Sequence, residues 1–132
     1  MMRLPFLIFL LLAVPASAVT IDDPAPSSDA LIGTWDVSLY FSPDQPPSST
    51  VMTISSTEGG VLKGTFYSTE FSVGRVRVHN DELIFTAVTE DGSGPYLHSG
   101  RLRGGVIEGQ TLSTGRDFLM AWDARKAAPE EE

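Results

Sequence analysis

The sequence contains no cysteine, and this absence removes several classes of protein at once. A disulfide-stapled fold, a thiolate metal site, a cysteine nucleophile and a lipid anchor on an N-terminal cysteine are all excluded. Histidine and tryptophan are scarce, with two of each. Stability must therefore come from backbone pairing and core packing, and few side chains are candidates for catalysis.

Sequence motifs of common enzymes are also missing. The chain has no Gly-x-Ser-x-Gly, no His-Glu-x-x-His and no glycine-rich phosphate loop. A catalytic set drawn from His98, Ser99 and Asp91 fails, because neighbouring residues of a strand point to opposite faces. The segment 91–94 lacks the further carboxylates of a calcium loop. We therefore expect no metal or cofactor site, and an enzyme is the least favoured of the functions that remain open.

Basic residues are outnumbered, at 9 against 17 acidic residues, which gives a formal net charge of −8. Nucleic acids and anionic lipid surfaces carry the same sign of charge and are not expected as partners. The simplest role of this acidity is solubility.

The one long hydrophobic run lies at the start of the chain. Arg3 precedes an apolar segment at 6–14, Pro15 ends it, and Ala16-Ser17-Ala18 has the small residues of a cleavage site. This arrangement predicts a secretory signal peptide over residues 1–18 that is cleaved after Ala18. The run is shorter than the roughly 20 residues that cross a bilayer. We expect a periplasmic or extracellular protein with no membrane insertion after cleavage.

Beyond the signal peptide, composition divides the chain into three parts. Residues 19–30 are rich in proline and small polar residues and predict a flexible N-terminal arm. Residues 31–125 form one continuous block that we predict to be a single β-domain. Residues 126–132 predict a disordered acidic tail.

Hydrophobic residues in the central block alternate with polar ones at a period of two. From Leu31 to Phe41, for example, every second residue is apolar or glycine. This period is typical of half-buried strands, and short turn segments such as Gly59-Gly60 and Gly104-Gly105 separate them. The predicted strands cover 31–41, 51–57, 61–68, 71–79, 82–90, 96–103, 106–113 and 117–125.

Eight strands joined by tight turns predict an antiparallel up-and-down meander. Closing such a meander into a barrel removes its two unpaired edges, and eight strands leave room for side chains or one small ligand. The predicted fold is therefore an all-β, eight-stranded antiparallel meander barrel. A two-sheet β-sandwich is the alternative.

Short motifs give the chain a family resemblance. The strand that opens with Gly33-Thr34-Trp35 resembles the first strand of lipocalin-like and avidin-like barrels, where the indole plugs the barrel floor. The segment 62–67 looks like their third strand, and 115–118 resembles the Gly-x-Asp near the last strand of avidins. The resemblance implies a lipocalin/avidin-like barrel. The chain has too few tryptophans for a biotin site of avidin type, and lacks the disulfides and C-terminal helix of animal lipocalins.

A closer resemblance is to an uncharacterised family of small bacterial secreted β-domain proteins. It is carried by five short segments and a final Trp122, the segments being 64–67, 74–75, 91–96, 109–113 and 115–119. This resemblance implies a fold and a compartment.

Inward-facing side chains are the candidates for a ligand pocket. Arg101 and Arg103 mark one side of their strand as the solvent side, which turns Tyr96 and His98 inward. Core packing is the favoured role for most of these residues, and His98 is the best single candidate for contact with a ligand. The predicted lining residues are Trp35, Phe66, Phe85, Tyr96, His98, Met120 and Trp122.

Four arginines are predicted to face outward. Arg75 and Arg77 alternate with valines, and Arg101 and Arg103 do the same with other residues two strands later. They form either a solvated face balanced by glutamates or an anion-binding stripe. Arg116 and the adjacent aspartate form either an ion pair or part of a barrel mouth.

Three functions remain open at this point. The first is a secreted binding module for a small apolar or amphipathic ligand. The second is a structural or interaction protein whose barrel is filled and which binds a periplasmic protein partner. The third is an enzyme that acts through His98.

Overall fold

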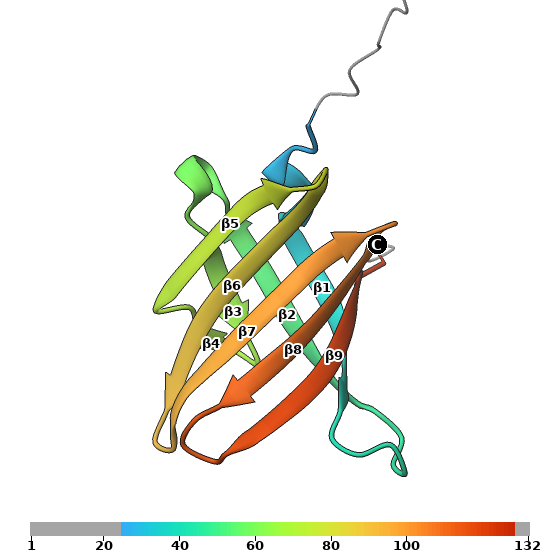
Figure 1. The fold of residues 1–132 in the computed structure, drawn as a ribbon, viewed down its shortest axis with the longest axis vertical. Helices are drawn as coiled ribbons and strands as arrows, with labels where there is room; N and C mark the ends of the chain where they lie inside the picture. Colours follow the sequence, from blue (N-terminus) through green and yellow to red (C-terminus); the bar gives the residue numbers. More distant parts are fainter. Residues whose placement is uncertain (1–24, 129–132) are drawn as a thin grey trace, which may run out of the picture.

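The computed structural model describes residues 25–128, and it is all-β. The expected signal peptide and residues 129–132 lie outside the described residues. Nine strands form one antiparallel sheet, in the order β4-β3-β2-β1-β9-β8-β7-β6-β5, that curls into a half-barrel (Figure 1). The strands are β1 (Gly33–Tyr40), β2 (Ser48–Ser56), β3 (Lys63–Phe66), β4 (Thr69–Glu70), β5 (Val73–His79), β6 (Glu82–Asp91), β7 (Gly94–Arg103), β8 (Val106–Ser113) and β9 (Phe118–Lys126).

The prediction of eight strands was wrong by one, because the segment 61–68 ends in a hairpin. Tyr67 and Ser68 adopt positive φ angles of 54° and 63°, as the two central residues of a tight hairpin turn do. The chain then returns as the short strand β4, in which Glu70 pairs with Thr65 and Thr69 with Phe66. A strand of two residues has no hydrophobic period, so the pattern could not reveal it.

Other boundaries differ at the ends of strands. β2 begins at Ser48, before the predicted start, and residues 58–60 form the 3-10 helix η2 (Glu58–Gly60) in place of a simple hairpin turn. The last strand includes Lys126, and the Ala127 N–H donates to the Thr34 carbonyl at 2.9 Å. The first residues of the expected acidic tail therefore belong to the sheet.

A second 3-10 helix, η1 (Ser28–Leu31), covers one end of the half-barrel. The Trp35 indole N–H donates to the Leu31 carbonyl at 2.9 Å, and both side chains are buried. On the outer side, the Lys126 ammonium lies 5.5 Å from the centre of the Trp35 ring and donates to the Ile32 carbonyl. Trp35 is thus packed at the η1 end of the fold, and residues 28–30 of the expected arm pack against the domain. No helix among residues 25–128 is long and apolar enough to cross a membrane.

A glycine pair lies at the centre of the core. Gly100 and Gly109 are register partners on β7 and β8, where a Cβ would overlap the rings of Phe85 and Trp122 respectively. These two rings therefore lie over the glycines, and their centroids are 6.4 Å apart although their strands are separated by two others. The pair belongs to one inward-facing cross-strand row: Val76, Phe85, Gly100, Gly109, Trp122 and Leu39.

Backbone contacts also link the two end regions of the sheet. The residue after η2, Val61, bridges to Arg75 of β5, and the Leu62 N–H donates to the Gly74 carbonyl at 3.0 Å. A Cβ at Gly74 would overlap the Leu62 carbonyl, so this approach depends on glycine. The segment between β2 and β3 therefore pairs directly with β5.

We predict that Gly109→Ala lowers the free energy of unfolding by about 1–3 kcal/mol, because the added methyl group forces Trp122 out of a close-packed position. Gly92→Ala is the matched control, since a Cβ there meets nothing within 4 Å. Urea denaturation of both variants measures the difference. Equal stability of the two variants would contradict the packing described here.

Candidate functional site

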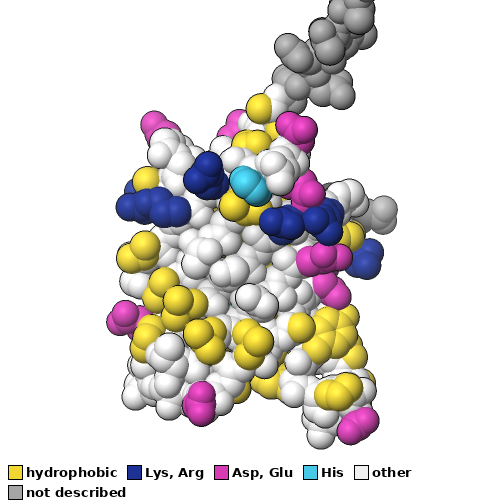
Figure 2. Space-filling model, in the orientation of Figure 1, with side chains coloured by type: hydrophobic (Ala, Val, Ile, Leu, Met, Phe, Trp, Pro, Cys, Tyr) yellow, Lys and Arg dark blue, Asp and Glu magenta, His cyan; other side chains and the backbone are white. Residues whose placement is uncertain are grey.

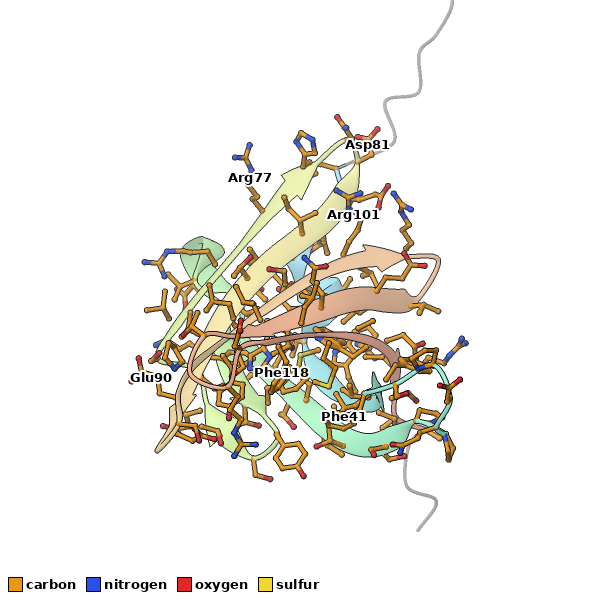
Figure 3. All side chains as sticks on the ribbon, turned by 60° about the horizontal axis from the view of Figure 1, so that its bottom comes forward. Phe41, Arg77, Asp81, Glu90, Arg101 and Phe118 are labelled. Carbon is orange, nitrogen blue, oxygen red and sulfur yellow. The ribbon has the colours of Figure 1, made fainter. Side chains whose placement is uncertain are left out.

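A cavity of about 350 Å³ lies at the end of the half-barrel opposite η1. Figure 3 brings this end forward and labels Phe41, Glu90 and Phe118, which surround the opening. Four of the seven predicted pocket residues line the cavity: Phe66, Tyr96, His98 and Met120. The other lining residues are Leu39, Phe41, Tyr67, Thr69, Thr89, Glu90, Asp91, Thr111, Arg116 and Phe118.

The remaining three predicted residues lie elsewhere in the core. Trp35 packs at the opposite end beneath η1, and Phe85 lies over Gly100. Trp122 lies behind Phe66, with ring centroids 5.3 Å apart, and its indole N–H donates to the Thr111 hydroxyl at 3.0 Å. They share the inward face with the cavity residues but sit at deeper register positions, so they pack the core and do not line this cavity.

His98 forms the floor of the cavity and is almost fully buried, at 3% exposure. Nε2 lies 2.9 Å from the Thr89 hydroxyl and Nδ1 lies 2.8 Å from the Thr111 hydroxyl. Phe66 stacks on the ring at a centroid distance of 4.1 Å. Burial lowers the pKa of His98 from 6.5 to about 4, so the ring is neutral at pH 7.

These contacts give His98 a structural role. A neutral imidazole has one N–H and one lone pair, and the two threonine hydroxyls satisfy both. Among residues 25–128, every buried side-chain nitrogen and oxygen has a hydrogen-bond partner. His98 therefore offers the cavity no free hydrogen-bonding group. Together with Phe66, which stacks on it, it forms an apolar or neutral part of the cavity wall.

The polar groups that are accessible to a ligand lie at the rim. The Tyr96 hydroxyl donates to Asp91 Oδ2 at 2.8 Å, and Asp91 Oδ1 accepts from the Ser93 N–H at 2.7 Å. These bonds lower the pKa of Asp91, the Ser93 amide contributing most, and raise the pKa of Tyr96. The Arg116 guanidinium reaches the Ser93 hydroxyl at 3.3 Å. The cavity lining thus combines one cation, Arg116, with two carboxylates, Asp91 and Glu90, and two phenols, Tyr96 and Tyr67.

Sequence reasoning missed most of this rim. Asp91 is part of a turn, and only the β6–β7 register brings it to Tyr96. Phe118 shares the inward face of β9 with Met120 and Trp122, as the alternation of the last strand indicates. Arg116 lies at the cavity opening, as one of its two readings suggested, and it forms no ion pair with Asp117: both ion pairs among residues 25–128 involve Glu82.

The cavity can hold an apolar group and contact a polar one. Its deep wall is apolar or neutral, and its charged groups are confined to the opening. Within residues 25–128, no three histidine, aspartate or glutamate side chains gather closely enough to hold a metal ion.

Comparisons with protein-family models, with curated proteins and with solved structures find no match to this chain.

We predict that stability falls as the pH is lowered from about 6.5 towards 4. Between these values the unfolded chain protonates His98 and the folded protein does not, which costs up to about 3 kcal/mol of unfolding free energy. The His98→Gln variant lacks this titration, so its unfolding free energy should change less between pH 7 and pH 5. Denaturant titrations at both pH values measure the difference, and identical pH slopes would argue against a buried neutral ring.

Proposed function

We propose that the chain is an exported binding protein that holds a small amphipathic ligand at one end of an up-and-down barrel. Export rests on the predicted signal peptide over residues 1–18. The contacts of Leu62 with Gly74 support barrel closure over a two-sheet sandwich, because they join the two end regions of the meander across its open side.

The observation that carries the proposal is the division of the cavity into two zones. Phe66, Met120 and Phe118 supply apolar wall, and Arg116 supplies a positive charge at the opening. A volume of about 350 Å³ is at the small end of the range for ligand sites, about 300–1,000 Å³. The fitting ligand has one ring system or a short chain and a single polar or anionic head.

Burial of the apolar part provides most of the affinity, at about 25 cal/mol per Å² of apolar surface removed from water. The head group then sets the orientation, since Arg116 and the Tyr96 hydroxyl both lie at the rim. Asp91 discriminates against ligands with more than one negative charge, because its carboxylate lies beside the same opening.

The first experiment is native mass spectrometry on protein exported from cells and purified without organic solvent. We expect a protein mass that begins at Val19, together with a stoichiometric extra mass that is lost on denaturation. A mass that retains residues 1–18 would overturn the export proposal. If the protein carries no extra mass, binding is tested with an added probe.

The probe is naphthalene-1-sulfonate, a fluorescent molecule that joins one apolar ring system to one anion. We predict that Arg116→Gln weakens its binding about 5-fold, equivalent to about 1 kcal/mol for an exposed charge contact. Arg125→Gln, which makes the same charge change on β9 away from the cavity, should leave binding unchanged. Fluorescence titration measures both. Equal losses in the two variants, or no binding by the wild type, would overturn the pocket proposal.

A second candidate function is an interaction protein, and one observation favours it. Five apolar residues on the outer face are register partners across β5, β6, β7, β8 and β9: Val73, Val88, Leu97, Leu112 and Leu119. Figure 2 shows hydrophobic side chains gathered across the lower part of this face. Leu119 is 67% exposed and Val73 54% exposed, so the row offers apolar surface to a protein partner.

We call these five residues the apolar row. A second copy of the chain is its simplest partner, because the residues on both sides of the central leucine are apolar and two such rows can pack against each other in antiparallel orientation. If the row self-associates, Leu119→Lys should abolish a dimer that the wild type forms near 100 µM (a concentration of order 10⁻⁴ M, typical of weak association). Val51→Lys on β2 is the control, since Val51 is also exposed but lies outside the row. Sedimentation velocity measures the association, and a monomeric wild type would remove this candidate for self-association.

A further inference from the structure

A second hollow lies on the outer face of β5, β6, β7 and β8, on the opposite side of the sheet from the core. It has a volume of about 930 Å³ and is bordered at one side by Gly59 and Gly60 of η2. Four arginines line it: Arg75, Arg77, Arg101 and Arg103. Figure 2 shows dark blue side chains in the upper part of this face, above the apolar row, and Figure 3 labels Arg77 and Arg101. We call this hollow the arginine groove.

Strand register explains why these arginines converge. Arg77 on β5 pairs with Ile84 on β6, and Ile84 pairs with Arg101 on β7. The two guanidiniums therefore rise from backbone positions about 10 Å apart, two strand spacings, on either side of an apolar side chain. Arg75 and Arg103 extend the arrangement along their own strands, at the same outward-facing positions two residues away.

Carboxylates neutralise only part of this charge. Glu82 accepts from the Arg103 Nε at 2.8 Å and lies 3.7 Å from the Arg101 Nε. The pKa of Glu82 is lowered chiefly by its bond from Arg103, which marks it as ionised. Within residues 25–128 neither Arg75 nor Arg77 forms an ion pair, and the Arg75 guanidinium instead donates to the Gly74 carbonyl.

The imbalance is unusual for this chain. Four of its nine basic residues line one hollow, although the formal net charge is −8 and acidic residues are nearly twice as numerous. If this face served only to keep the protein soluble, the less abundant basic residues would have no reason to be concentrated on it. Glu108 also lines the hollow, as the register partner of Arg101, so the lining carries four positive charges and one negative charge. A concave surface with a net positive charge attracts anionic ligands.

The other lining groups indicate what kind of anion fits. Thr86 and Ser99 lie beside the arginines, with their hydroxyl oxygens 3.1 Å apart, and Gln110 adds an amide. Ile84 supplies a small apolar contact between the guanidiniums. Spaced cations, several hydroxyl-binding groups and a small apolar contact match a sugar chain that carries acidic groups.

We propose that the arginine groove binds an acidic oligosaccharide. Carboxylate or sulfate groups of the sugar pair with the guanidiniums of Arg75 and Arg77, which no carboxylate of the described chain neutralises. Hydroxyls of the sugar ring contact Thr86, Ser99 and Gln110. Single-stranded nucleic acid fits less well, because the groove offers no exposed aromatic side chain for base stacking and the whole chain is acidic.

The test is isothermal titration calorimetry at pH 7 in low salt with three tetrasaccharides. Tetragalacturonate carries only carboxylates, a heparin-derived tetrasaccharide carries sulfates in addition to carboxylates, and maltotetraose is neutral. We expect binding of at least one acidic probe, weakened by added salt, and no binding of maltotetraose. Binding of tetragalacturonate would show that carboxylates suffice, and binding of the heparin tetrasaccharide alone would indicate that sulfates are required. A hexaglutamate peptide that binds more tightly than both acidic sugars would overturn the oligosaccharide assignment.

A matched pair of double variants places the site. Arg75→Gln combined with Arg77→Gln should weaken the acidic probe by about 10-fold, since it removes the two arginines without ion pairs. Lys63→Gln combined with Arg125→Gln makes the same change in net charge outside the groove and should alter binding by less than about 2-fold. Thermal unfolding checks that each variant is folded, and Arg77→Gln alone serves if the first pair is not.

Equal losses in the two double variants would mean that the probe responds to net charge alone, and would overturn the proposal. Binding of maltotetraose as tightly as the acidic sugars would do the same, as would a lack of binding by all three sugars.

Discussion

The absence of two side chains at the centre of the sheet determines how the rest of the protein packs. Because Gly100 and Gly109 are register partners, Phe85 and Trp122 can cross the backbone of β7 and β8 and meet above it. Two large rings drawn together over a bare stretch of backbone favour a strongly curled sheet, since a flat sheet would keep strands three positions apart at about 14 Å. The same stretch also forms part of the arginine groove on the outer face. One glycine pair thus shapes both the core and the opposite surface.

The interior is organised in cross-strand layers, and each layer has its own chemistry. Above the aromatic layer comes a row with His98, Thr111 and Met120, and above that a row with Tyr96 and Phe118. The histidine layer is polar but self-satisfied, because its hydroxyls and ring nitrogens bond to one another and to the Trp122 indole. It therefore works as a floor: it ends the close-packed core without leaving a buried polar group that would draw in water. The cavity begins where this layer ends.

The outer face is also graded along the strands. Residues near the cavity end form the apolar row, the next row holds two hydroxyls, an amide and Arg75, and the rows beyond carry the other three arginines. Since each row is set by the same register that builds the core, inner and outer chemistry are coupled. A shift of two residues in the pairing of β6 with β7 would separate Arg77 from Arg101 and at the same time move His98 away from Thr89.

Register also explains which features of the structure could be predicted from the sequence and which could not. The period of two located eight of the nine strands and gave the correct face for His98, Trp122 and the four outward arginines, because a strand's faces follow from alternation alone. It could not show how far along the interior each inward-facing residue lies. Trp35, Phe85 and Tyr96 all face inward, yet Trp35 lies at the η1 end, Phe85 in the middle and Tyr96 at the cavity opening. Depth and convergence depend on which residues are opposite one another across strands, and that depends on turn lengths such as the Tyr67-Ser68 hairpin. A single strand's pattern does not contain this information, so it could not show that only four of the seven predicted pocket residues line the cavity.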